Sequence, residues 1–262
     1  MPPKEFGMKK VFLNEFSAHE LQELLAQPEK ITAICTFGSC ENHGWHCCLG
    51  PDTFVPTEVA KRAAERVGNT LVVPCVPFGT SINYNKFPMA VTLRYETVIA
   101  IAEDIFESLI SYGIKHIYIL NGHDGNIAPL GIAAAKVKDR HADAKFLYLP
   151  AWWEKVGPLM GSRFEVWNGL GHGGEGETSL MMALRPDLVD LSKAVAQMPD
   201  NITRIGEKAN VVWDIKEISE TGATGDPTKA TAEKGRQMLD ILVDLVASAI
   251  EDMNRIGWNY SK

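Results

Sequence analysis

The chain has 262 residues, of which 45% are hydrophobic and 23% are charged. This balance is ordinary for a globular protein with a substantial core. The net charge of −7 argues against a nucleic-acid or acidic-membrane partner, and no apolar run approaches the ~20 residues needed to span a bilayer. Five cysteines, an odd number that includes the adjacent Cys47 and Cys48, indicate reduced thiols in a cytoplasmic protein rather than a disulfide framework.

The first 150 residues alternate between short apolar runs and longer stretches with helical periodicity. Ser17 and Glu20 form a capping box, which predicts a short helix from 18 to 26. Gly68 ends a second helix, and Asn126 is the predicted N-cap of another. The predicted strands are 31–37, 71–76, 116–120 and 145–150, and the predicted helices after the first are 53–67, 94–112 and 127–141.

The pattern after residue 150 is less regular. We expect a loop at 151–171, a short helix at 177–184, a mostly irregular segment at 188–224 with a hairpin near 211–213, and a final helix at 229–253. Strands that alternate with helices predict an α/β protein with a mostly parallel sheet covered on both faces. Since the sequence shows no repeat and no linker, we expect a single domain over residues 1–262.

Residues of metal-ligand type follow the predicted strands in three segments: Glu41, His43 and Asp52; then His123; then His172, Glu175 and Glu177. Parallel strands bring their carboxyl ends to one edge of a sheet, so these segments can converge. Carboxylates and imidazoles suit zinc, manganese or iron(II). Simpler interpretations remain for each segment: a polar loop, tight turns at the flanking glycines, and a carboxylate placed to stabilise a helix N-terminus.

Longer motifs surround these residues. They include Gly38–His46 (GSCENHGWH), Asn121–Asn126 (NGHDGN), His172–Ser179 (HGGEGETS) and Gly225–Gly235 (GDPTKATAEKG). With these motifs in this order over residues 12–249, the chain resembles the creatininase (creatinine amidohydrolase) family. The resemblance implies a three-layer α/β/α fold, two divalent metal ions per chain (Zn, Mn or Fe), and a homo-oligomer, often a hexamer.

The resemblance also implies roles for the ligand-type residues. Asp52 would bridge the two ions, Glu41 and His123 would complete one site, and His43 would serve the other with a second carboxylate. Gly125 has no side chain that could ligate, so Glu175 is the predicted second carboxylate and Asp124 the alternative. The predicted catalytic residues are Glu175 and His172, the latter as acid and base near the leaving group.

Predicted substrate contacts come from four residues: Ser81, Tyr84, Asp124 and Trp167. Trp167 is the predicted lid. Trp152 and Trp153 fit core or subunit packing as well as they fit a substrate pocket. Cys47 and Cys48 are expected to pack as small hydrophobic residues, and His46 is expected to support the ligands.

The family resemblance implies a hydrolase that opens a small cyclic carbonyl compound with a hydroxide generated at the metal ions. A cyclic amide is the first expectation, although Cys47, Cys48 and Met89 depart from the family pattern around the pocket. One alternative is carbon–carbon cleavage of a cyclic polyol diketone, 3-dehydro-scyllo-inosose, which belongs to inositol catabolism. Another is a non-catalytic metal- or ligand-binding protein on the same scaffold.

Overall fold

A sheet of four parallel strands, in the order β2-β1-β3-β4, is the centre of the structure. The computed structural model describes residues 10–206, 208–209 and 211–260. The strands are β1 (Thr32–Phe37), β2 (Thr70–Val76), β3 (His116–Asn121) and β4 (Lys145–Leu149). Phe37 is level with Asn121 in the register of β1 and β3. The segments that follow these two strands therefore leave the sheet side by side at its carboxyl edge.

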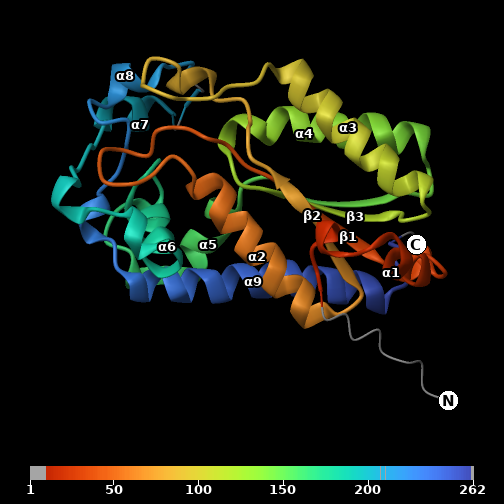
Figure 1. Ribbon diagram of the computed structural model, residues 1–262. Coiled ribbons are helices and arrows are strands. Elements are labelled where there is room, and N and C mark those ends of the chain that lie inside the picture. The colour runs from red at the N-terminus through yellow and green to blue at the C-terminus, as the bar shows by residue number, and fades with distance from the viewer. Residues whose placement is uncertain (1–9, 207, 210, 261–262) are drawn as a thin grey trace.

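Helices cover both faces of the sheet (Figure 1). The helices are α1 (Ala18–Leu24), α2 (Pro51–Val67), α3 (Tyr95–Ser111), α4 (Ile127–Arg140), α5 (Trp152–Met160), α6 (Glu175–Leu184), α7 (Asp200–Gly206), α8 (Ile215–Ile218) and α9 (Ala232–Arg255). On β1, Ala33, Cys35 and Phe37 pack with α3 and α4. Ile34 points to the other face and belongs to the core that includes side chains of α2, α5, α6 and α9. The alternation of side chains along the strand thus builds two cores and the expected three layers.

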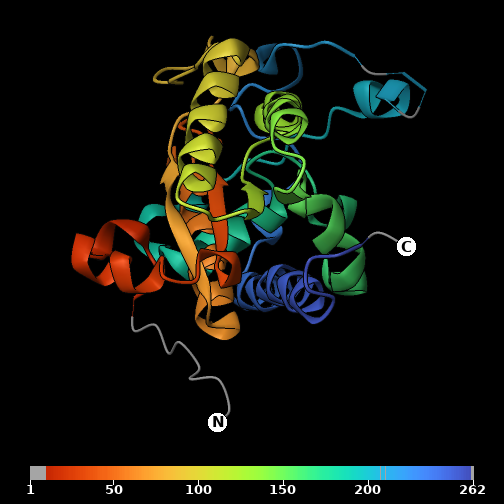
Figure 2. The same ribbon diagram turned by 90° about the vertical axis from the view of Figure 1, so that its right-hand side faces the viewer.

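The order of the layers is clear from two directions. Figure 1 shows α3 and α4 on one side of the sheet and α2 and α9 on the other, and Figure 2 shows the long α9 nearly end-on beneath the strands. No helix within the described ranges is long and apolar enough to cross a membrane.

The predicted strands are confirmed to within one residue at each end. The capping box is also confirmed, since the Glu20 amide donates to Ser17 Oγ and the Ser17 amide donates to the Glu20 carboxylate. Gly68 ends α2 in a left-handed conformation, with φ 93°. Each of these features depends on residues that are close together in the sequence, so the sequence pattern was enough to predict them.

Two local predictions are wrong, and a third is right in position only. The expected loop at 151–171 contains α5, which includes Gly157 and Pro158 and is stabilised by packing its apolar side chains against α9. No strand forms at 211–213, where Val212 is 97% exposed and Trp213 packs against Tyr84. Asn126 stands at the N-cap position but makes no capping bond, because its side chain bonds to distant backbone groups.

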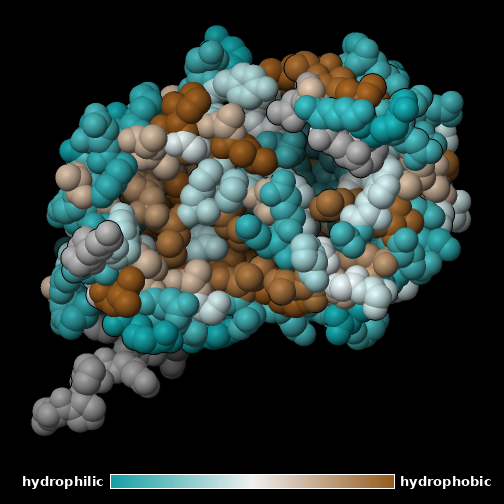
Figure 3. Space-filling view, turned by 180° about the vertical axis from the view of Figure 1, so that it is seen from behind, coloured by the Kyte–Doolittle hydropathy of each residue, from teal (hydrophilic) through white to brown (hydrophobic). Residues whose placement is uncertain are grey.

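Hydrophobic and hydrophilic residues are interspersed on the face seen from behind (Figure 3). The large hydrophobic side chains that are exposed in the structure include Trp45 and Met89, at 59% and 70%. Isolated exposed hydrophobic residues are normal on protein surfaces. The expectation of a homo-oligomer therefore stays a prediction.

Candidate metal centre

Two neighbouring strands and one helix deliver the central side chains. The segment after β1 carries Glu41 and His43, α2 carries Asp52 in its first turn, and the segment after β3 carries His123. Gly122 allows α2 to approach, because a Cβ at this position would lie 2.1 Å from the Asp52 carbonyl oxygen. Asp52 was expected in a loop, but it lies inside α2, where the helix N-terminus favours a negative charge.

The side chains form groups that could hold metal ions, and two of these groups share Asp52. In the first, His123 Nδ1 lies 3.3 Å from Glu41 Oε1 and 3.0 Å from Asp52 Oδ2. In the second, His43 Nε2 lies 3.1 Å from Asp52 Oδ1 and 3.9 Å from Glu177 Oε2. The two oxygens of one carboxylate therefore face two separate sets of ligand atoms.

Backbone carbonyls fix the orientation of the imidazoles. His123 Nε2 donates to the Thr80 carbonyl at 2.8 Å, and His43 Nδ1 donates to the Glu41 carbonyl at 3.1 Å. His172 Nε2 donates to the Asn42 carbonyl. A carbonyl only accepts hydrogen bonds, so in each neutral ring the other nitrogen keeps a free lone pair. That nitrogen faces the carboxylates, which is the arrangement that metal-binding histidines use.

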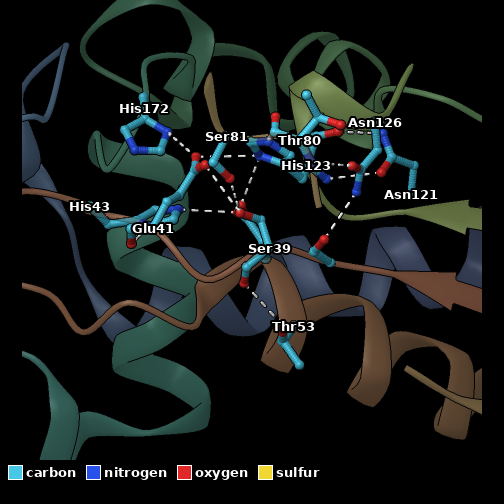
Figure 4. A network of polar contacts seen from close by, with 12 residues as sticks. Ser39, Glu41, His43, Thr53, Thr80, Ser81, Asn121, His123, Asn126 and His172 are labelled. Carbon is cyan, nitrogen blue, oxygen red and sulfur yellow. Dashed lines mark hydrogen bonds and ion pairs between the residues drawn. The ribbon is translucent and has the colours of Figure 1, made fainter. Parts of the chain in front are cut away.

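Hydrogen bonds also hold the carboxylate of Glu41 in place (Figure 4). Ser39 Oγ donates to Glu41 Oε2 at 3.1 Å and lies 2.7 Å from Ser81 Oγ. Glu41 Oε1 and Asp52 Oδ2 are buried and, while the His123 ring is neutral, have no hydrogen-bond donor among the described residues, because His123 Nδ1 then faces them with its lone pair. Buried carboxylate oxygens without a partner are costly, and a divalent cation would compensate both. The donor set and its orphaned oxygens therefore fit a pair of metal ions.

The charges of the site are tightly linked. Burial disfavours the imidazolium of His43, but the Asp52 carboxylate outweighs it and raises the pKa of His43 to about 10. Burial raises the pKa of Glu177 to about 7, against the opposing effect of His43. Metal ligands must be deprotonated. Cations that enter this site therefore have to displace protons from His43 and Glu177.

We expect metal affinity to rise with pH. Below pH 7 the metal-free protein holds protons on both His43 and Glu177, and between pH 7 and 10 it still holds the proton on His43. Each displaced proton should strengthen apparent Zn²⁺ affinity roughly tenfold per pH unit. Calorimetric titration of metal-free protein at pH 6, 7 and 8, in buffers with different ionisation enthalpies, measures both affinity and proton release. Affinity that is independent of pH would contradict this arrangement of ligands.

Glu175 lies apart from these groups. Its carboxylate is fully buried and is occupied by the Lys234 ammonium at 2.6 Å and by the backbone amides of Glu165 and Val166. The structure thus corrects the expected assignment of Glu175 as ligand and catalytic residue. Glu177, which the sequence equally allowed as a simple helix charge, occupies the place beside His43.

The ring of His172 lies between two other rings. Its centroid is 4.2 Å from that of His43 and 4.3 Å from that of Tyr84. Burial, reinforced by His43, lowers the pKa of His172 to about 4. The ring is therefore neutral at pH 7, and its Nδ1 lies 3.8 Å from Glu41 Oε1. A neutral imidazole there can accept a proton and pass it on.

A cavity of about 200 Å³ opens over these groups. Two of the predicted substrate contacts, Tyr84 and Asp124, line it, and so do His172, the predicted acid and base, and Trp152 and Trp153. Trp213 also lines it, and the sequence gave no signal for this residue beyond its type. Within the described chain, two predicted contacts do not line the cavity.

These two residues are Ser81 and Trp167. Ser81 bonds to Ser39 behind Glu41, because the segment after β2 turns back against the segment after β1. Trp167 lies in the left-handed region, with φ 47°, and the following residues, 168 to 171, form the cavity wall instead.

His46 and the two adjacent cysteines lie around the site without joining the ligand groups. His46 Nε2 is 2.8 Å from Thr178 Oγ1, and Thr178 in turn donates to the carbonyl of Gly173. This bond ties the loop after β1 to the N-terminal end of α6. Cys47 and Cys48 are free thiols that pack, partly buried, against the core.

Comparison with known proteins identifies the family. The family model described as "Creatininase: Creatinine amidohydrolase" matches residues 14–250. Creatinine amidohydrolase of Pseudomonas putida is 31% identical over 93% of this chain and 97% of that protein. The chain belongs to the creatininase family. It is accordingly a metal-dependent hydrolase of that family, whether an amidohydrolase or a related enzyme.

Other creatininase-family proteins are more distant. The mycofactocin precursor peptide peptidase of Mycobacterium tuberculosis is 25% identical over 80% of this chain and 81% of its own length. The 3-dehydro-scyllo-inosose hydrolase of Thermotoga maritima is 24% identical over 93% and 83%.

Solved creatininase structures share the fold. A manganese form has a TM-score of 0.79 and 31% identity, covering 93% of this chain and 98% of that one. A mutant complexed with creatine also has a TM-score of 0.79, at 30% identity over 93% and 98%. A further mutant is described as a Zn-Zn type. Creatininases thus bind manganese and zinc, and the buried ligand groups described above are suited to such ions.

Proposed function

We propose that this protein is a dinuclear metal hydrolase that opens a small cyclic amide. The observation that carries the proposal is the carboxylate of Asp52, whose two oxygens face two separate ligand groups. Glu41 and His123 would hold one ion with Asp52, and His43 and Glu177 would hold the other. When bound, two such ions polarise a substrate carbonyl and lower the pKa of water.

The cavity supports a small, flat substrate. Its volume of about 200 Å³ is small, and its wall includes the aromatic rings of Tyr84, Trp152, Trp153 and Trp213. Aromatic walls bind planar rings through dispersion and ring stacking. The relative from Pseudomonas putida, which is named for creatinine hydrolysis, has higher identity to this chain than the inosose hydrolase does. Together these facts favour a cyclic amide over a polyol diketone.

His172 is the proposed group for proton transfer. Its Nε2 is held by the Asn42 carbonyl, so Nδ1 is the nitrogen available to the substrate side. Because the ring is neutral at pH 7, it can take a proton from the attacking water and return it to the leaving nitrogen. The ring of Tyr84 packs against this imidazole at an interplanar angle of 39°.

Asp124 is the proposed determinant of charge preference. Four carboxylates and no lysine or arginine are found among the described residues of the cavity wall, and Asp124 is the carboxylate outside the ligand groups. We expect Asp124→Asn to raise KM for substrates with cationic or N–H donor groups by roughly tenfold, as for one lost charged hydrogen bond. Steady-state kinetics with creatinine and an uncharged cyclic amide measure the difference. Equal effects on both substrates would contradict this role.

Elemental analysis with a substrate screen tests the proposed function. We expect about two zinc, manganese or iron atoms per chain, and ring opening of creatinine or another small cyclic amide by the metal-loaded protein. Turnover of 3-dehydro-scyllo-inosose but of no cyclic amide would show that the reaction is carbon–carbon cleavage rather than amide hydrolysis. Metal-loaded protein that turns over neither class of compound would contradict the proposal and favour a binding protein.

A further inference from the structure

A loop with unusual backbone geometry forms one wall of the cavity. This wall loop, residues 165–171, includes two consecutive non-glycine residues in the left-handed region, Trp167 with φ 47° and Asn168 with φ 55°. Gly169 and Gly171 also have positive φ. Such conformations cost free energy in residues with side chains, so the surrounding structure has to hold them in place. Residues 168 to 171 line the cavity directly.

A buried carboxylate holds the start of this wall loop. The amides of Glu165 and Val166 both donate to Glu175 Oε2 at 3.0 Å, and the Glu165 amide also lies 3.2 Å from Glu175 Oε1. Glu175 is the first residue of α6 and is fully buried. The metal-facing Glu177 stands only two residues further along the same helix. Helix α6 therefore places the Glu177 carboxylate beside the metal-ligand residues and the Glu175 carboxylate against the wall loop.

A lysine from the last helix balances the charge of Glu175. Lys234 Nζ lies 2.6 Å from Glu175 Oε1, 2.9 Å from the Lys229 carbonyl and 3.3 Å from Glu165 Oε1. Only 15% of the Lys234 side chain is exposed. The ammonium joins α9, α6 and the wall loop at one point. A buried carboxylate that accepts from two amides and an ammonium is well ordered.

We propose that Glu175 and Lys234 act as a clamp that positions the wall loop and thereby shapes the substrate cavity. Glu175 is on this account a positioning residue. It orders the backbone of the loop before substrate arrives, so that residues 168 to 171 already face the metal-ligand groups. The inference rests on the proposed function for what the cavity binds, but the clamp itself can be tested without any substrate.

The test compares the same substitution at two positions of α6. In Glu175→Gln, an N–H group replaces one of the two carboxylate oxygens that accept from the Glu165 amide, the Val166 amide and the Lys234 ammonium. Hydrogen exchange at these two amides should therefore accelerate at least tenfold. The metal content should stay as in the parent protein. In Glu177→Gln, metal content should fall by about half while these amides remain protected. Glu233→Gln, an exposed carboxylate on α9, is the control. Site-resolved hydrogen exchange and elemental analysis give the two readouts.

Lysine variants keep the inference testable if Glu175→Gln does not fold. Lys234→Met should accelerate exchange at the same two amides, and Lys234→Arg should restore protection because it keeps the charge and the donors. Unchanged protection in Glu175→Gln or Lys234→Met would overturn the clamp. Loss of metal in Glu175→Gln equal to that in Glu177→Gln would also overturn it, since Glu175 would then act as a ligand. Either outcome leaves the hydrolase proposal to be judged by turnover.

Discussion

Replacing Asp52 with alanine should remove both metal ions and abolish turnover. Its two carboxylate oxygens lie 3.1 Å from His43 Nε2 and 3.0 Å from His123 Nδ1, so they serve both ligand groups. Removing an outer partner of a metal ligand typically costs 10–100-fold in affinity or activity, and a ligand shared by two ions should cost more than about 100-fold. Elemental analysis and turnover of the same samples measure the effect.

Two companion variants make the Asp52 result specific. Asp52→Asn keeps the shape of the side chain and removes the charge, so it should lose metal to a similar degree if the carboxylate bridges the ions. Asp187→Asn changes an exposed carboxylate that pairs with Arg185, and it should change neither metal content nor activity. If Asp52→Ala kept both metal ions, the shared site would be wrong. If Asp52→Ala kept one metal ion, the two ions would occupy independent sites and Asp52 would serve only one of them.

Replacing His172 with alanine should separate chemistry from metal binding. Loss of a positioned acid and base typically lowers the rate by roughly 10²–10⁴-fold, whereas the two ligand groups that share Asp52 do not need this ring. The kcat should therefore fall by that factor with the metal content near two atoms per chain. Steady-state kinetics and elemental analysis of His172→Ala provide the comparison.

Because of where His172 lies, the metal content of the His172→Ala variant is as informative as its kcat. His172 also forms a possible ligand group with Glu41 and His43. Loss of a metal ion in His172→Ala would therefore identify it as a ligand rather than a proton carrier. Unchanged kcat with full metal content would remove it from the mechanism. The matched control is His141→Ala, because this histidine directly follows α4 and pairs with Glu107 away from the ligand groups.

The sequence alone predicted the four strands of the sheet and four of the side chains that the structure brings together. Short apolar runs predicted the strands, and a capping box and helix-ending glycines predicted helix ends. Each of these signals depends only on residues that are close together in the chain. Parallel strands necessarily bring the residues after them to one edge. Glu41, His43, Asp52 and His123 therefore could be expected to meet before the structure was known.

The choice between two nearby carboxylates was decided only by tertiary structure. Glu175 and Glu177 are two residues apart, which places them about 200° apart around a helix of 3.6 residues per turn. The sequence does not reveal which of the two faces the metal ligands, because that depends on how α6 packs against α9. Lys234 on α9 neutralises Glu175 and leaves Glu177 beside His43.

Long-range contacts decided the remaining features for the same reason. Asn126 had the composition of an N-cap, but its amide bonds the Gly38 carbonyl and the Thr80 amide, which lie far away in the chain. Trp213 reaches the cavity through its contact with Tyr84. Local patterns carry the conformational preferences of neighbouring residues, whereas a partner more than 40 residues away exists only once the chain has packed.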